Sequence, residues 1–154
     1  MFRSTLTAPR FLGIAALLFT LSLSTVASNL PTTDSKDREV SKYVNLKLQI
    51  WQDRMNLKDW DIQVEMVRSG QLEPKTLGNV HWDTDIKQAK IMVLASEDYK
   101  LPYKEVLEDM EVTVVHELVH IQLASLPRSD ASRRTEEHAV CEITSALLKL
   151  ARAK

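Results

Sequence analysis

The amino-acid sequence predicts an α+β fold in which one helix, three strands and two further helices follow one another along the chain. Apolar residues recur at three-to-four spacing over 36–55, alternate with polar residues over 60–69, and return to helical spacing beyond residue 103. After removal of an N-terminal segment roughly 125 residues remain, which is the size of one domain with a modest core. We therefore expect one domain, 38–154, whose helices pack on a single sheet.

The N-terminal segment has the three parts of a secretory signal. Two arginines precede the apolar run 11–23, and small residues suited to cleavage follow at 24–28. The run is short for a membrane-spanning helix. We therefore predict a signal peptide over 1–27 and a polar leader over 28–37. The mature protein is expected to be secreted or periplasmic, with no membrane segment after cleavage.

Composition narrows the classes of partner. The chain has 20 basic and 21 acidic residues, so its charges nearly cancel and predict no surface for nucleic acid or for an anionic membrane. Its one cysteine, Cys141, has no intrachain partner for a disulfide. Stability must then come from packing or from a bound metal, and we expect Cys141 to be a small buried residue.

The first half of the domain is expected to contain a helix and three strands. The strand over 60–69 alternates as a half-buried strand does, and strands over 76–83 and 89–96 flank a short polar turn and predict a hairpin. The helix over 36–55 places its apolar residues on one face: Val40, Val44, Leu48, Trp51 and Met55.

The second half is expected to be helical. Pro102 can begin a helix over 103–125, and Pro127 follows its end. A last helix over 133–152 is expected after a polar loop, with Thr135 or Ser132 as its N-cap. The apolar stripe of this last helix is expected to be Val140, Ile143, Leu147 and Leu150.

The helix over 103–125 contains the pattern HExxH in an otherwise apolar stretch. His116 and His120 are four residues apart, so both imidazoles lie on one side of the helix and can bind one ion. Glu117 is displaced by about 100° and can approach that ion from the flank. Polar side chains in an apolar helix cost several kcal/mol unless each has a partner, and a metal is the partner this pattern predicts.

The third ligand decides the class of metal site. A three-histidine peptidase pattern, HExxHxxGxxH, needs glycine at 123 and histidine at 126, and this chain has Leu123 and Leu126. The ribonuclease-like pattern HxxxHxxxxxH is excluded for the same reason. A glutamate from the following helix remains, and the segment TEEHAV offers Glu136 and Glu137.

With these residues the chain resembles the gluzincins, the thermolysin-like zinc peptidases, and its length is similar to that of the minigluzincins. The resemblance implies a minimal zincin-like domain, an active-site helix, a glutamate helix and a zinc-dependent peptidase that cleaves a peptide or protein substrate. One position departs from the family pattern. Where these enzymes carry an acidic residue one turn after the glutamate ligand, this chain has Val140 or Cys141.

Two arguments concern the choice between the glutamates. Glu136 lies on the helical line of the apolar stripe, whereas Glu137 lies about 100° round from it. A ligand must sit where core meets cleft, because zinc needs an open position for water and substrate. That requirement favours Glu137, and the spacing of apolar residues after the ligand in thermolysin-like enzymes agrees. The alternative is that both are first-turn acids that complement the helix dipole.

The resulting hypothesis is an exported zinc peptidase in which His116, His120 and Glu137 hold the ion. Zinc-bound water would ionise near pH ~7, and Glu117 would act as general base and pass the proton to the leaving amine. The alternative is a zinc-stabilised exported binding module or an inactive peptidase relative that recognises a protein partner. Candidates for a residue that stabilises the oxyanion are His81, Tyr99, Tyr103, His138 and Arg133.

The strand over 77–82 is predicted to lie at the edge of the sheet beside the metal. An exposed strand edge can bind a peptide through its main chain. Gly78 would let another backbone approach closely.

Overall fold

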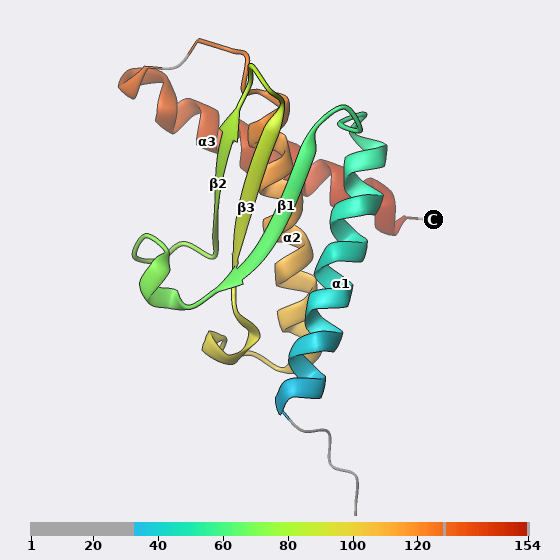
Figure 1. Cartoon of the computed structure of the whole chain (residues 1–154). Coiled ribbons are helices and arrows are strands. Elements are labelled where there is room, and N and C mark those ends of the chain that lie inside the picture. The colour runs from blue at the N-terminus through green and yellow to red at the C-terminus, as the bar shows by residue number, and fades with distance from the viewer. Residues whose placement is uncertain (1–32, 128, 154) are drawn as a thin grey trace, which may run out of the picture. The chain divides into compact units, whose positions relative to one another are not determined.

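A computed structural model describes residues 33–127 and 129–153, and its elements follow the predicted α+β order (Figure 1). The predicted signal peptide, 1–27, lies outside the described residues. No helix in the described part of the chain is long and apolar enough to cross a membrane. The helices and strands are α1 (Thr33–Arg54), β1 (Asp61–Val67), β2 (Gly78–Asp83), β3 (Gln88–Leu94), α2 (Tyr103–Gln122) and α3 (Asp130–Arg152).

The three strands form one mixed sheet in the order β1-β3-β2. β1 pairs with β3 in parallel, with Val64 opposite Ile91, and β2 pairs with β3 in antiparallel fashion, with Val80 opposite Ile91. The hairpin prediction is therefore confirmed. The prediction that the strand near 77–82 lies at a sheet edge is confirmed as well, since β2 is the outermost strand on its side.

One face of this sheet is covered by α1 and α2 (Figure 1). Side chains of β3 alternate accordingly: Ala89, Ile91 and Val93 are buried, whereas Lys90 is exposed on the opposite face. The predicted apolar face of the first helix is confirmed. Four of its residues, Val40, Val44, Leu48 and Trp51, are buried in the main core, and Met55 packs against that core.

A polar cluster ties α1 to α2 at the margin of this core. The Nε1 atom of Trp51 donates a hydrogen bond of 2.8 Å to Glu111, and Nζ of Lys47 lies 2.9 Å from the other carboxylate oxygen. The hydroxyl of Tyr43 donates to the same oxygen at 3.4 Å. Glu111 therefore connects three side chains of α1 through one carboxylate.

The last helix begins earlier than the sequence suggested. Its N-cap is Ser129, whose hydroxyl accepts a hydrogen bond of 3.2 Å from the backbone N–H of Ser132. The hydroxyl of Ser132 accepts in return from the backbone N–H of Ser129 at 3.0 Å, which completes a capping box. The expected caps at Ser132 or Thr135 were therefore wrong. Because α3 starts at Asp130, Glu136 and Glu137 do not lie in its first turn.

The buried side of α3 is narrower than the predicted stripe. Val140, Thr144 and Leu148 are buried along one line of i, i+4 spacing, as their contacts with the rest of the domain require. Ile143 and Leu150 were predicted on the buried side but are 40% and 70% exposed. Cys141 is also exposed, contrary to expectation, because it follows Val140 by about 100° around the helix. Leu147, also predicted on the buried side, is partly buried and packs against the main core.

Candidate metal centre

The C-terminal half of α2 brings His116 and His120 to one side of the helix. Their side chains are 21% and 15% exposed, so both rings are mostly buried and only partly accessible to solvent. The residues around them are fully apolar and buried: Val114, Val115, Leu118 and Val119. Glu117, at the flank position, is itself only 6% exposed. The helix therefore holds three polar side chains at the boundary between core and solvent.

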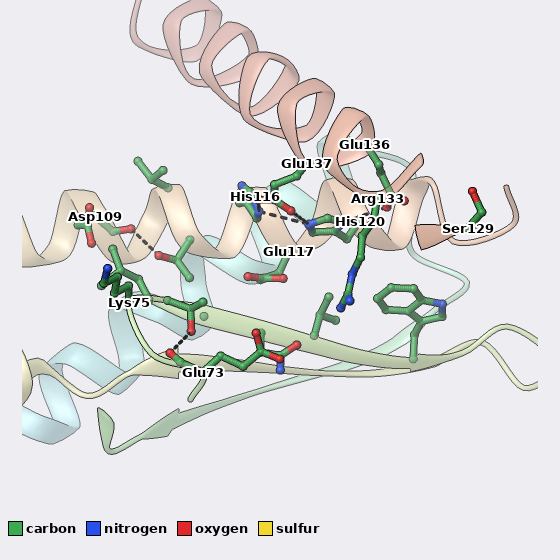
Figure 2. A pocket seen from close by; sticks show the side chains of 18 residues that line it. Glu73, Lys75, Asp109, His116, Glu117, His120, Ser129, Arg133, Glu136 and Glu137 are labelled. Carbon is green, nitrogen blue, oxygen red and sulfur yellow. Dashed lines mark hydrogen bonds and ion pairs between the residues drawn. The ribbon is translucent and has the colours of Figure 1, made fainter. Parts of the chain in front are cut away.

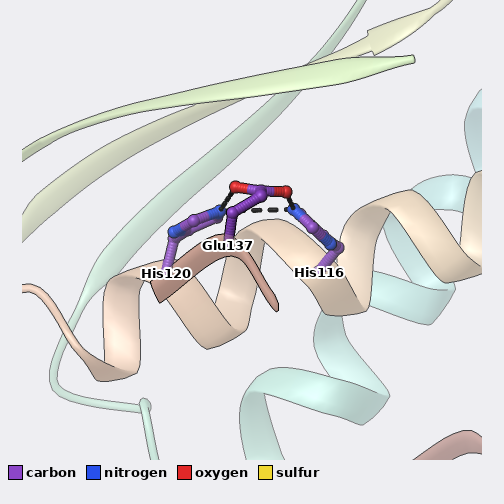
Figure 3. A group of neighbouring side chains, drawn as sticks. All are labelled: His116, His120 and Glu137. Atoms are coloured by element: carbon purple, nitrogen blue, oxygen red, sulfur yellow. Dashed lines mark hydrogen bonds and ion pairs between the residues drawn. The ribbon is translucent and has the colours of Figure 1, made fainter. Parts of the chain in front are cut away.

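α3 supplies the third side chain of the group (Figure 3). Oε1 of Glu137 lies 3.0 Å from Nε2 of His116, and Oε2 lies 3.3 Å from Nε2 of His120. The two Nε2 atoms are 3.2 Å apart. Candidate ligand atoms of His116, His120 and Glu137 all lie within 4.8 Å of one another, so the group can hold a metal ion.

These atoms lie close enough together to bind one metal ion. Two nitrogen or oxygen donors that each lie 2.0–2.1 Å from zinc at a tetrahedral angle are about 3.3 Å apart. The two Nε2 atoms are 3.2 Å apart, and each faces a different oxygen of Glu137, at 3.0 Å for His116 and 3.3 Å for His120. Two imidazoles and one carboxylate are also a donor set that zinc accepts, with the fourth position left for water or substrate. The three side chains can therefore hold a metal ion, and their donor atoms are of the kinds that zinc binds.

Glu136 has a different position from its neighbour. Its Oε1 atom lies 3.2 Å from Nδ1 of His120, and its side chain is 17% exposed against 55% for Glu137. A carboxylate on Nδ1 fixes the ring orientation and leaves Nε2 as the free ligand atom. Sequence reasoning missed this role because it looked for an orienting acid one turn after the ligand. The sequence signal for this role was that Glu136 precedes Val140 by four residues, which places both side chains on the same side of the helix.

A cleft of about 740 Å³ lies in front of this group. One wall is α2, the opposite wall is β2 with the loop before it, and the first turns of α3 close one end (Figure 2). Glu117 projects into the cleft from α2. The residues that line the cleft include His116, Glu117, His120, Glu136, Glu137, Leu77, Gly78, Asn79, Val80 and Trp82. The candidate metal ligands His116, His120 and Glu137, here called the metal group, therefore line the same cleft as the edge strand β2, as predicted.

Gly78 is required for the approach of β2 to α2. A Cβ atom at this position would overlap Cγ2 of Thr113 and would lie 3.0 Å from both Oε1 of Glu117 and the backbone oxygen of Met92. Sequence reasoning expected this glycine to let another backbone approach closely. The neighbours that occupy the space are side chains of α2, from Thr113 and Glu117, together with the backbone oxygen of Met92 on β3.

Burial is the main cause of the pKa shifts of Glu117 and His116. Burial, reinforced by the negative charge of Glu137, raises the pKa of Glu117 to about 8. Burial also lowers the pKa of His116, and the opposing attraction of Glu137 does not outweigh it. A lowered pKa keeps the imidazole neutral, which is the form that binds a metal.

Of the five candidates for an oxyanion-stabilising residue, Arg133 is the one that lines the cleft. His81 lies on the other face of the sheet, beside Gln63 and Lys90. Tyr103 stands at the start of α2, where Nζ of Lys36 is 5.6 Å from its ring centre. Tyr99 is a core residue whose pKa is raised by burial and by Asp109. His138 is exposed on α3 outside the cleft lining.

No family model matches this sequence, and no curated protein and no solved structure is significantly similar to it. The resemblance to the gluzincins therefore remains a prediction from the HExxH motif and the glutamate helix. The functional assignment depends on the geometry of the site.

Proposed function

We propose that the chain is an exported zinc-dependent peptidase of the gluzincin type. The observation that carries the proposal is the convergence of donor atoms from His116, His120 and Glu137 to within 4.8 Å of one another. Beside them, a buried glutamate faces the same cleft. A purely structural zinc site is normally closed by a fourth protein ligand. This group offers three ligand atoms, and the cleft lies on its open side.

Glu117 is the residue to which we assign proton transfer. It follows His116 on α2, so it would flank an ion held by His116, His120 and Glu137 without being a ligand, and its carboxylate enters the cleft. When bound, zinc supplies Lewis-acid chemistry: it lowers the pKa of a coordinated water to about 7 and polarises a carbonyl oxygen. In its ionised form Glu117 accepts a proton on one carboxylate oxygen and passes it to the nitrogen of the leaving amine.

β2 is the element to which we assign substrate alignment. It is an edge strand, so one side of its backbone has no partner strand among the residues that the structure describes. An extended peptide can add to such an edge through main-chain hydrogen bonds. Residues 78–80 and 82 line the cleft, so a peptide along this edge would pass the metal group and Glu117. We assign a peptide substrate because the edge of β2 lies along the same cleft as the metal group and Glu117.

Removal of the metal tests the proposal against a zinc-stabilised binding module. The main core contains residues from α1, β2, β3, α2 and α3, and none of the three candidate metal ligands belongs to it. We therefore expect a chelator to abolish peptide hydrolysis by the purified protein while its far-UV circular dichroism stays essentially unchanged. Added zinc should restore hydrolysis. Loss of secondary structure on chelation, from a zinc-loaded protein that cleaves no member of a peptide library, would support the module instead.

A further inference from the structure

Arg133 occupies a position that the proposed chemistry does not use. It lies four residues before Glu137 on α3, so both side chains project from the same side of the helix. Its side chain lines the cleft and extends from α3, past His120, towards β2 (Figure 2). A cation thus stands at the His120 end of the cleft, directly beside the metal group.

The guanidinium of Arg133 makes no hydrogen bond or ion pair with any residue that the structure describes. The nearest acids of α3 are engaged elsewhere. Glu137 faces the two histidines, and Glu136 contacts Nδ1 of His120. A guanidinium presents five N–H donors in a planar fork that matches a carboxylate. Arg133 therefore has its donors available at the place where a substrate would lie.

Charge in the rest of the cleft restricts where an anionic group can bind. Five carboxylates line it, from Glu73, Asp109, Glu117, Glu136 and Glu137, against two permanent cations, Lys75 and Arg133. Figure 2 shows the two cations at opposite ends, with Lys75 near Asp109 and Arg133 near His120. Among the lining side chains, Lys75 and Arg133 are therefore the permanent cations that can pair with a substrate carboxylate.

The two cations are not equivalent. Lys75 belongs to the loop before β2 and is a point charge on a flexible stem. Arg133 belongs to a capped helix that also holds Glu137, so its backbone has a defined position relative to the metal group. Arg133 is therefore the better placed of the two to recognise a carboxylate at a defined distance from the scissile bond.

We propose that Arg133 binds a carboxylate of the substrate at the His120 end of the cleft. This inference rests on the function proposed above and adds a substrate class to it: peptides with an acidic group next to the scissile bond. The carboxylate can come from an acidic side chain or from a free C-terminus, since a guanidinium fork binds both in the same way.

Binding to a non-hydrolysing variant tests the inference without turnover. In the Glu117→Gln background, affinities would be measured by calorimetry for four alanine-based peptides. One is blocked at both ends, one has a free C-terminal carboxylate, and two are blocked but carry a single internal Glu or Gln. We expect at least one carboxylate peptide to bind about tenfold more tightly than its neutral counterpart, as a charge-assisted pair does. The Glu and free-acid peptides distinguish the two sources.

Arg134 and Lys75 supply matched controls. Arg134 adjoins Arg133 on α3 and is exposed outside the cleft lining. Arg133→Ala should abolish the preference for the carboxylate, whereas Arg134→Ala and Lys75→Ala should keep it. Arg133→Glu should reverse it, so that a peptide with Lys in place of Glu binds more tightly.

Several results would overturn the inference. The Glu117→Gln protein could bind acidic and neutral peptides with equal affinity, or bind none of the four peptides. The preference for the carboxylate could also remain in Arg133→Ala. With Glu117 restored, an equal fall in kcat for acidic and neutral peptides on Arg133→Ala would also overturn it, because it would assign Arg133 to the oxyanion. Carboxylate-dependent binding without any hydrolysis by the wild-type protein would refute the peptidase proposal alone.

Discussion

Glu136 and Glu137, adjacent on α3, contact opposite nitrogens of the same imidazole. Oε1 of Glu136 lies 3.2 Å from Nδ1 of His120, and Oε2 of Glu137 lies 3.3 Å from its Nε2. One glutamate therefore orients the ring, while the other stands where a metal ligand would stand. Glu136 thus affects zinc binding through the orientation of His120, and Glu137 affects it as a ligand. We therefore expect zinc binding to depend more strongly on Glu137 than on Glu136.

We predict that Glu137→Ala weakens zinc binding by orders of magnitude and that Glu136→Ala weakens it by about 10–100-fold, the effect typical of a lost orienting partner. Glu136→Gln should retain most of the affinity, because its amide oxygen can still accept from Nδ1–H of His120. Competition titration with a chromophoric chelator measures all three. Glu142→Ala, an exposed acid on the same helix, is the control and should bind like the wild type. A larger loss for Glu136→Ala than for Glu137→Ala would reverse the two roles.

Gly78→Ala is expected to destabilise the domain by about 1–3 kcal/mol, as other overpacking substitutions do. The new methyl group would press on Thr113, on the carboxylate of Glu117 and on the backbone of Met92. Hydrolysis should fall as well, because β2 and Glu117 must move apart. Urea denaturation and peptide cleavage measure the two effects.

Two further variants make the Gly78 prediction specific. Gly70→Ala is the control, since nothing lies within 4 Å of a Cβ at that position. Thr113→Ser removes the methyl group that Gly78→Ala would meet and keeps the hydroxyl, so the double variant should recover part of the lost stability. Equal effects of alanine at 70 and 78, or no recovery in the double variant, would contradict the close approach.

Glu111 is expected to link stability to pH. Burial raises the pKa of its carboxyl, but the hydrogen bonds from Trp51 and Lys47 outweigh that effect and hold the pKa below its ordinary value. A carboxyl with a lowered pKa stabilises the folded state above its unfolded pKa, and the contribution is lost as pH falls through the folded value. Glu111→Gln should therefore cost about 1 kcal/mol at neutral pH.

The same substitution should cost progressively less in acid, because the wild-type carboxyl then loses its charge as well. Denaturant titrations between neutral pH and the acid limit of folding follow the difference. Glu108→Gln is the control on α2. Glu108 lies 3.8 Å from Lys104 with its side chain 52% exposed, and it should contribute less than about 0.5 kcal/mol. A pH-independent cost for Glu111→Gln would show that its charge is not what stabilises the contact.

Local patterns were sufficient to predict the elements and the metal-binding helix. The periodicity of Val40, Val44 and Leu48 and the alternation of β1 are properties of short segments, and the structure confirms both. The spacing of His116 and His120 is equally local. These features could be predicted because each depends on the geometry of one helix or one strand.

Features that depend on contact between elements were predicted less well. The burial of Leu148 and the exposure of Ile143 depend on which line of α3 meets the domain, and an amphipathic pattern alone does not fix that line. The parallel pairing of β1 with β3 likewise depends on long-range contacts. Glu136 was missed because its partner, His120, lies on another helix.

The central claim is that Glu117 transfers the proton beside a zinc ion held by other residues, and Glu117→Gln tests it most directly. Zinc content and the rate of peptide hydrolysis would be measured for the purified wild-type and variant proteins in the same buffer. We predict one zinc per chain in both, with hydrolysis by the variant reduced by about a hundredfold or more. A variant that hydrolyses peptides at the wild-type rate, or one that loses its zinc as His116→Ala does, would contradict the account.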